Sequence, residues 1–207
     1  MKNVIALLFY LSILSTASFA QLKPVKINAT KIPAYIKYKG KFIEGIEWTD
    51  KSGKNTLLLT ETGEQWKTND DYNYREQYLY AYHYLTTDSL KLDWKIQDYV
   101  KECEVDVLAN FVKNSTSITD LNNDGVAEIW LIYRVACRGD VSPSTMKIIM
   151  HEGSKKYIVR GESKVKYSQT DYAGDKMVFD VSFNNAPESF KTYATQLWNK
   201  YVLEKFE

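Results

Sequence analysis

The sequence predicts an α+β fold, mainly antiparallel β-sheet built from hairpins, with a C-terminal amphipathic helix packed on it. Two observations support this prediction. Short segments rich in aromatic and β-branched residues alternate with turn signals through most of the chain. Only near the C-terminus do apolar residues recur every three or four positions, which is the spacing of a helix that lies against a core.

Residues 1–20 are expected to form a secretory signal peptide outside the fold. Lys2 supplies a basic start, an apolar stretch runs from Val4 to Leu14, and small residues lead to Ala20. This apolar stretch is shorter than the roughly 20 residues of a membrane-spanning helix, so we expect cleavage rather than anchoring. Residues 21–207 would then form a single β-rich domain with no transmembrane segment. The expected location is the periplasm or the cell surface of a Gram-negative-type bacterium.

The charge balance argues against a nucleic-acid partner. The chain has 27 Lys and Arg against 26 Asp and Glu, and Lys2 would leave with the signal peptide, so the mature net charge is about zero. Binding to nucleic acid requires a surplus or a stripe of basic residues. No nucleic-acid partner is therefore expected.

The first part of the mature chain is expected to be an extended arm followed by strands. The arm covers residues 22–33 and contains two prolines. A short strand is predicted over Lys41–Trp48. Residues 56–60 and 64–67 then read as a hairpin around a turn at Gly63.

A second hairpin contains the run YLYAYHYL, from Tyr78 to Leu85, in which tyrosine occupies every second position. Alternating aromatic residues are typical of a strand, and residues 90–100 are expected to return beside it. The tyrosine row has two interpretations. We favour a half-buried face packed across neighbouring strands over an exposed platform for stacking of sugars.

The rest of the chain continues with strands and closes with the helix. Five strands are predicted, at residues 104–115, 126–137, 144–153, 156–161 and 176–183. The first of these also reads as a short helix. The C-terminal helix is expected at about 187–205, with Pro187 in its first turn. Its apolar face would consist of Phe190, Tyr193, Ala194, Leu197, Trp198, Tyr201 and Val202.

The two cysteines, Cys103 and Cys137, predict one structural disulfide. Exported compartments are oxidising, and an even number of cysteines there favours a bridge over free thiols. A nucleophilic cysteine would need a histidine nearby, and the chain has only His83 and His151.

Between the cysteines lies the segment ITDLNNDGVAEIWL, with the pattern D-x-N-x-D-G-x-x-E. Oxygen ligands at alternate positions of a curled loop suit calcium, and Gly125 permits the sharp bend. Leu131 stands where an EF-hand loop has its closing glutamate, so the segment looks more like the calcium loops of integrin-type propeller repeats, in a single copy. The expected ligands are the side chains of Asp120, Asn122, Asp124 and Glu128 and the backbone carbonyl of Val126.

The alternative to a calcium loop is a turn without metal, because Asn-Asp-Gly is a strong turn signal by itself. If calcium binds, its expected role is to brace the loop between two strands. No motif for a nucleophile elbow, a P-loop or a zinc protease is present, so the sequence points to no catalytic residue. Paired carboxylates for glycan cleavage remain open, because only their separation in space would identify them.

Residues 72–164 resemble a family of small exported bacterial proteins that are labelled as surface polysaccharide biosynthesis proteins. The resemblance rests on the run from Cys103 through the D-x-N-x-D-G loop to Cys137, followed by D-V-S-P-S and H-E-G. It implies an accessory or binding role, with surface polysaccharide or an envelope protein as the partner, and it transfers no catalytic residue. The alternative is an envelope glycan hydrolase that uses paired carboxylates.

Overall fold

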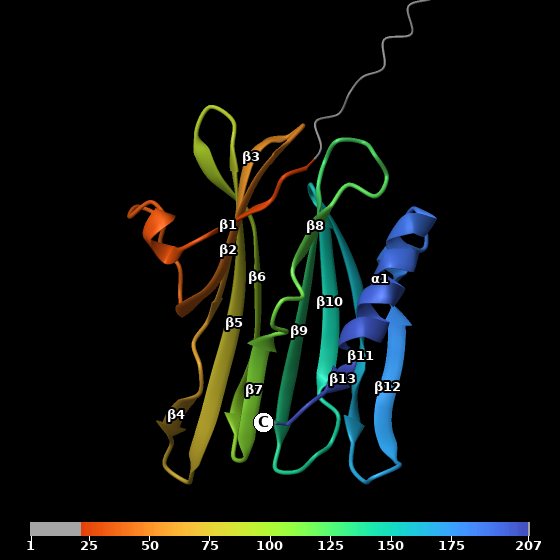
Figure 1. Ribbon diagram of the computed structural model, residues 1–207. Helices are drawn as coiled ribbons and strands as arrows, with labels where there is room; N and C mark the ends of the chain where they lie inside the picture. The colour runs from red at the N-terminus through yellow and green to blue at the C-terminus, as the bar shows by residue number, and fades with distance from the viewer. Residues whose placement is uncertain (1–21, 207) are drawn as a thin grey trace, which may run out of the picture.

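The computed structural model describes residues 22–206, which fold into two β-sheets and a C-terminal helix (Figure 1). The strands are mostly long and antiparallel. Their bounds are β1 Val25–Ile27, β2 Lys41–Asp50, β3 Gly53–Glu61, β4 Gln65–Thr68, β5 Asn73–Thr86, β6 Leu90–Cys103, β7 Asp106–Phe111, β8 Ser117–Thr119, β9 Glu128–Arg138, β10 Thr145–Glu152, β11 Lys155–Lys166, β12 Tyr172–Phe179 and β13 Leu203–Glu204. The helix α1 covers Glu188–Tyr201. The expected signal peptide lies outside the described residues.

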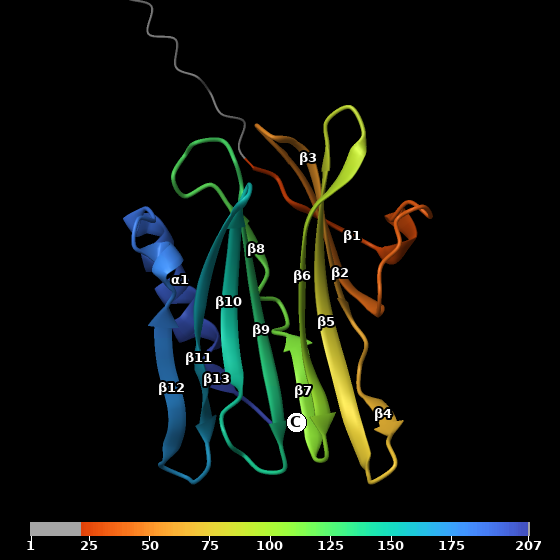
Figure 2. The same cartoon turned by 180° about the vertical axis from the view of Figure 1, so that it is seen from behind.

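The two sheets divide the chain at the turn between β6 and β7. The first sheet has the order β1-β2-β3-β5-β6, with β4 paired to the start of β5. The second has the order β12-β11-β10-β9-β7, with β8 also on β9 and the short β13 parallel to β11. Figure 1 and the reverse view in Figure 2 show the sheets edge-on and facing each other. Among residues 22–206, no helix is long and apolar enough to cross a membrane.

The largest core lies between the sheets. It is made by alternate side chains of the inner strands, because successive residues of a strand point to opposite faces. Leu57, Leu59 and Leu79 of the first sheet meet Leu131 and Ile149 of the second, and all five side chains are buried.

The helix α1 covers the other face of the second sheet (Figure 1). Trp130 and Ile148 of the sheet pack in one cluster with Phe190, Leu197 and Trp198 of the helix. The C-terminal helix predicted from the sequence is therefore present.

The helix is shorter than the predicted range of 187–205. It ends at Tyr201, and Leu203–Glu204 form the strand β13 beside β11. The reason is the carboxylate of Glu204, which accepts hydrogen bonds from the hydroxyls of Ser144 at 2.7 Å and Ser163 at 2.6 Å. Because these buried hydrogen bonds hold Glu204 beside β11, the chain leaves the helix after Tyr201.

The tyrosine row faces away from the main core, yet it is mostly buried. Tyr80, Tyr82 and Tyr84 are at most 8% exposed, because the segment around Ile36 lies across them. The favoured interpretation of the row as a packed face is confirmed. The alternative, an exposed platform of these rings for stacking of sugars, is wrong.

Two strand predictions need correction. Residues 56–60 and 64–67 do not form a hairpin with each other, since β3 pairs with β2 and β5, and β4 pairs with β5. The apolar β3 is buried at the centre of the sheet, which requires a neighbour on each edge. The strand predicted at 176–183 instead ends at Phe179, because the side chain of Asp180 accepts a hydrogen bond from the Ser182 N–H and starts a 3-10 turn.

Candidate functional site

The predicted calcium loop is a corner between the paired strands β8 and β9, where Thr119 lies opposite Glu128. Asp120 accepts hydrogen bonds from the backbone N–H groups of Asp124 at 3.1 Å and Gly125 at 3.2 Å. Asp124 in turn accepts one from Val126 at 2.8 Å. Gly125 has φ +84°, a conformation that glycine adopts without strain. The aspartates thus hold the loop in its curled form.

The remaining predicted ligands lie at the base of the same loop. The Glu128 side chain is fully buried and accepts hydrogen bonds from the Thr119 hydroxyl at 2.6 Å and the Leu121 N–H at 2.9 Å. Burial raises its pKa, the two hydrogen bonds oppose the rise, and the charges of Asp120 and Glu152 add to it. A cation in the loop would relieve this repulsion among carboxylates.

Glu152 was not among the ligands predicted from the sequence, although it stands beside Glu128 in the ladder between β9 and β10. The amide of Asn122 donates to Glu152 at 2.6 Å, and the Asn122 oxygen accepts from the Asp124 N–H at 3.1 Å. No sequence pattern indicated Glu152 as a ligand, because only the pairing of β9 with β10 brings it to the loop.

The loop also ties the second sheet to the first. The carboxylate of Asp50, at the end of β2, accepts a hydrogen bond from the Ala127 N–H at 3.0 Å, and the Lys51 N–H donates to the Gly125 carbonyl at 2.8 Å. Burial acts to raise the pKa of Asp50, but hydrogen bonds from Ser52, Ala127 and Trp48 outweigh it and lower the pKa. The Asp50 side chain is therefore ionised, and its hydrogen bond to Ala127 connects the two sheets.

Within residues 22–206, no three side chains of the His, Cys, Asp or Glu types form a group that could hold a metal ion. The carboxylates of the loop are directed to backbone N–H groups of the loop itself. Calcium binding by the loop stays a prediction.

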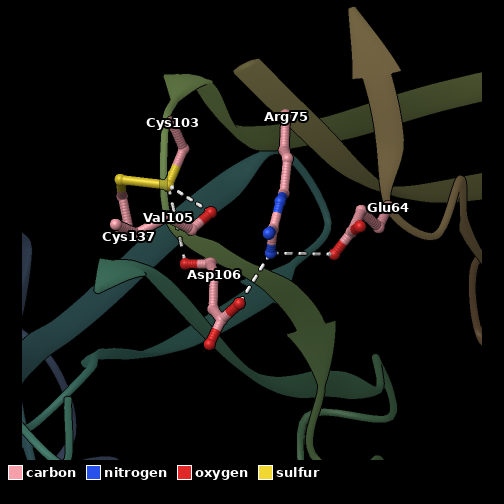
Figure 3. The surroundings of a disulfide bond; sticks show 6 residues. All are labelled: Glu64, Arg75, Cys103, Val105, Asp106 and Cys137. Carbon is pink, nitrogen blue, oxygen red and sulfur yellow. Dashed lines mark hydrogen bonds and ion pairs between the residues drawn. A yellow bond between two sulfur atoms is a disulfide. The ribbon is translucent and has the colours of Figure 1, made fainter. Parts of the chain in front are cut away.

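The predicted disulfide is present. Cys103, at the end of β6, is bonded to Cys137 of β9, with 5.6 Å between their Cα atoms (Figure 3). The bridge therefore joins the two sheets at the end opposite the loop. Beside it, Arg75 forms ion pairs with Asp106 at 2.6 Å and with Glu64 at 3.6 Å.

An open cleft of about 880 Å³ lies along the free edge of β7. It runs from the first sheet, past β7, to the C-terminal segment. Its walls mix apolar side chains with charged ones, as ligand sites with orienting polar groups do. The lining residues include Glu61, Asn110, Phe111, Arg134, Arg138 and Phe206.

Glu61 lies inside the cleft and links the two sheets. Its carboxylate accepts hydrogen bonds from the Phe111 N–H at 2.7 Å and the Asn110 amide at 2.8 Å. Burial raises the pKa of Glu61, while these two hydrogen bonds and the charge of Lys113 oppose the rise. The carboxylate satisfies a backbone donor on the free edge of β7, which protects the edge against pairing with another strand.

Two arginines of β9 form another part of the cleft wall. Arg134 donates to the backbone carbonyls of Tyr201 and, at 3.3 Å, Leu203, while Arg138 is paired with Glu204 at 2.5 Å. The Arg138 guanidinium also lies 4.8 Å from the ring of Phe206, which is 46% exposed. This wall therefore offers fixed cations and one accessible aromatic ring.

The sequence did not identify the cleft, because its residues come from segments far apart in the chain. Glu61, Arg134 and Phe206 lack any local motif, and only the packing of the two sheets brings them together.

No family model matches the chain, and neither a curated protein nor a solved structure matches it. Its function is therefore inferred from the geometry of the molecule.

Proposed function

We propose that the protein is an exported accessory or binding protein linked to cell-surface polysaccharide, with the cleft along β7 as its ligand site. The observation that carries this proposal is the cleft itself, whose volume suits a short stretch of glycan. The disulfide supports the exported location, because such bridges persist in oxidising compartments.

The chemistry of the cleft suits a sugar chain. Sugar rings combine an apolar face with hydroxyl groups, so they need an aromatic ring beside hydrogen-bonding groups. Phe206 supplies an exposed ring beside Arg138, and Arg134, Asn110 and Glu61 supply polar atoms to the same cleft. The calcium-capable loop and the disulfide stand at opposite ends of the sandwich, and their proposed role is to hold its sheets in register.

Titration of purified envelope polysaccharides by isothermal calorimetry tests the proposal. Phe206→Ala is expected to weaken binding about fivefold, since an aromatic contact contributes roughly 0.5–1.5 kcal/mol. Tyr172→Ala is the matched control, because Tyr172 is equally exposed, at 46%, on the distant edge strand β12. Absence of binding to every envelope glycan, or an equal loss in both variants, would contradict the proposal.

A glycan hydrolase is the second candidate, and the buried Glu61 with its raised pKa favours it, because such a carboxyl suits a general acid. The mechanism needs a second carboxylate about 5–10 Å away. Three other acidic residues of the cleft are engaged in ion pairs, Glu44 with Lys26, Asp106 with Arg75 and Glu204 with Arg138. The fourth, Asp140, accepts a hydrogen bond from the Ser142 N–H at 2.9 Å. We therefore favour binding. Release of reducing ends from an envelope glycan, abolished by Glu61→Gln, would instead identify a hydrolase.

A further inference from the structure

The outer face of the first sheet carries a strip of lysines held over tyrosine rings. The lysine–tyrosine strip consists of Lys39, Tyr78, Lys95, Tyr99 and Lys101. Lys39 belongs to the segment before β2, and the other four residues lie along β5 and β6, on the side of the first sheet that faces away from the second sheet. The three lysines are exposed, and Tyr99 is 47% exposed.

The ammonium groups of the strip are positioned by the rings beneath them. The Lys95 nitrogen lies 4.9 Å from the centre of the Tyr80 ring, and the Lys101 nitrogen lies 4.8 Å from that of Tyr99. Tyr78 and Tyr99 pack with their ring centres 5.5 Å apart. Two cations are thus held beside an open aromatic surface, which reduces the entropy lost when they bind an anion.

The N-terminal segment adds further positive charge to this face. Residues 22–43 contain six lysines and no acidic residue, and one of the six, Lys26, is paired with Glu44 at 2.7 Å. The Lys39 N–H donates to the Tyr82 hydroxyl at 3.0 Å, and the Lys95 nitrogen lies 5.5 Å from the same ring. This contact joins the segment to the strip. The whole chain has a formal net charge of only +1, so the positive charge of this segment is balanced by acidic residues elsewhere in the chain.

One carboxylate lies within the strip. The Tyr78 hydroxyl donates to Glu76 at 3.1 Å, at the end of the row near Lys101. A single acidic group does not cancel the charge of the exposed lysines around it. The alternation of cations and rings remains the dominant feature of the surface.

We propose that the lysine–tyrosine strip binds an acidic polysaccharide, whose carboxylates pair with the lysines while a sugar ring packs on Tyr99. The choice of a glycan rests on the proposed function, but the surface is separate from the cleft. An anion without a sugar ring would need contacts with the lysines only. The exposed ring of Tyr99 is what fits a sugar, since it offers an apolar face beside the charges.

Binding of polygalacturonate, measured by calorimetry at low and at physiological salt, tests the strip. The double variant Lys95→Gln and Lys101→Gln is expected to weaken binding about tenfold, because each exposed charge contact contributes up to roughly 1 kcal/mol. Binding of the unchanged protein should also weaken with salt. The matched control is Lys156→Gln with Lys200→Gln, which removes the same charge from exposed positions on β11 and α1.

A second variant separates recognition of sugar from attraction to any polyanion. Tyr99→Leu should weaken binding of polygalacturonate several-fold and leave binding of inorganic polyphosphate unchanged. The proposal is overturned if polygalacturonate does not bind, if the control variant loses as much affinity, or if only anionic phospholipid vesicles or DNA bind. If the cleft does not bind glycan, a separate result would show it: the Phe206→Ala variant would keep its affinity for the envelope glycans.

Discussion

At the scale of single residues, His151 is the most unusual group in the core. Both of its ring nitrogens are buried without a hydrogen-bond partner in the described part of the chain. The ring stacks on Trp94 with 4.1 Å between centres, and Trp94 in turn contacts His83. Burial lowers the pKa of His151 to about 4, and the charges of Lys156 and His83 add to the effect.

His151 should therefore make the fold sensitive to acid. Its folded pKa of about 4 lies below the unfolded value of 6.5, so the unfolded chain binds a proton more readily, and stability falls as the pH drops from 6.5 towards 4. The loss attributable to His151 is about 3 kcal/mol. Urea unfolding at pH 7 and pH 4.5 should show a smaller change for His151→Phe than for the unchanged protein. An identical change in both would contradict the prediction.

At the scale of elements, the loop between β8 and β9 combines a local and a tertiary role. The sequence predicted its curled shape, since Asp and Asn at alternate positions before a glycine bond their own backbone. Its contact with Asp50 and Lys51 at the end of the first sheet had no sequence signal. A metal at this corner would stabilise the attachment between two sheets as well as the loop.

Calcium is accordingly expected to stabilise the fold. With an affinity on the order of 0.1–1 mM, 10 mM calcium should raise Tm by about 3–8 °C. Asp124→Ala should abolish this rise, and Asp171→Ala, in the exposed loop between β11 and β12, should retain it. The measurement is thermal unfolding followed by circular dichroism, with and without EDTA. If EDTA leaves Tm unchanged, the loop is a turn without metal.

At the scale of the whole molecule, stability depends on links between the two sheets. The disulfide closes one end, and Asp50 with the loop closes the other. Between them, Lys147 of the second sheet pairs with Asp98 of the first at 2.5 Å. Because the polar links stand beside a continuous apolar core, they fix the register of the sheets.

Removal of the disulfide should weaken the fold without changing it. The bridge spans 34 residues, so Cys103→Ala with Cys137→Ala is expected to lower the free energy of unfolding in urea by about 3–4 kcal/mol.

When the full chain is produced in a Gram-negative host, the periplasmic fraction should contain protein without residues 1–20. Its intact mass should lie two hydrogens below that of the reduced form. An uncleaved, reduced protein in the cytoplasm would contradict the proposed export.

Local patterns in the sequence were sufficient to predict most of the secondary structure and the disulfide. The hairpin of β5 and β6, the strand β9 and the helix α1 follow from the periodicity of nearby residues, and an even pair of cysteines is sufficient to predict their bond. The alternation of tyrosines indicated a packed face for the same local reason.

Which strands are neighbours, and which residues they enclose, depends on the packing of the folded chain. The burial of β3 between β2 and β5, the anchoring of Glu204 that ends the helix, and the cleft around Glu61 depend on contacts between segments far apart in the chain. Periodicity reports which face of a strand is buried, but it does not specify the partner that buries it. For that reason the candidate ligand site and the lysine–tyrosine strip became visible only in the folded molecule.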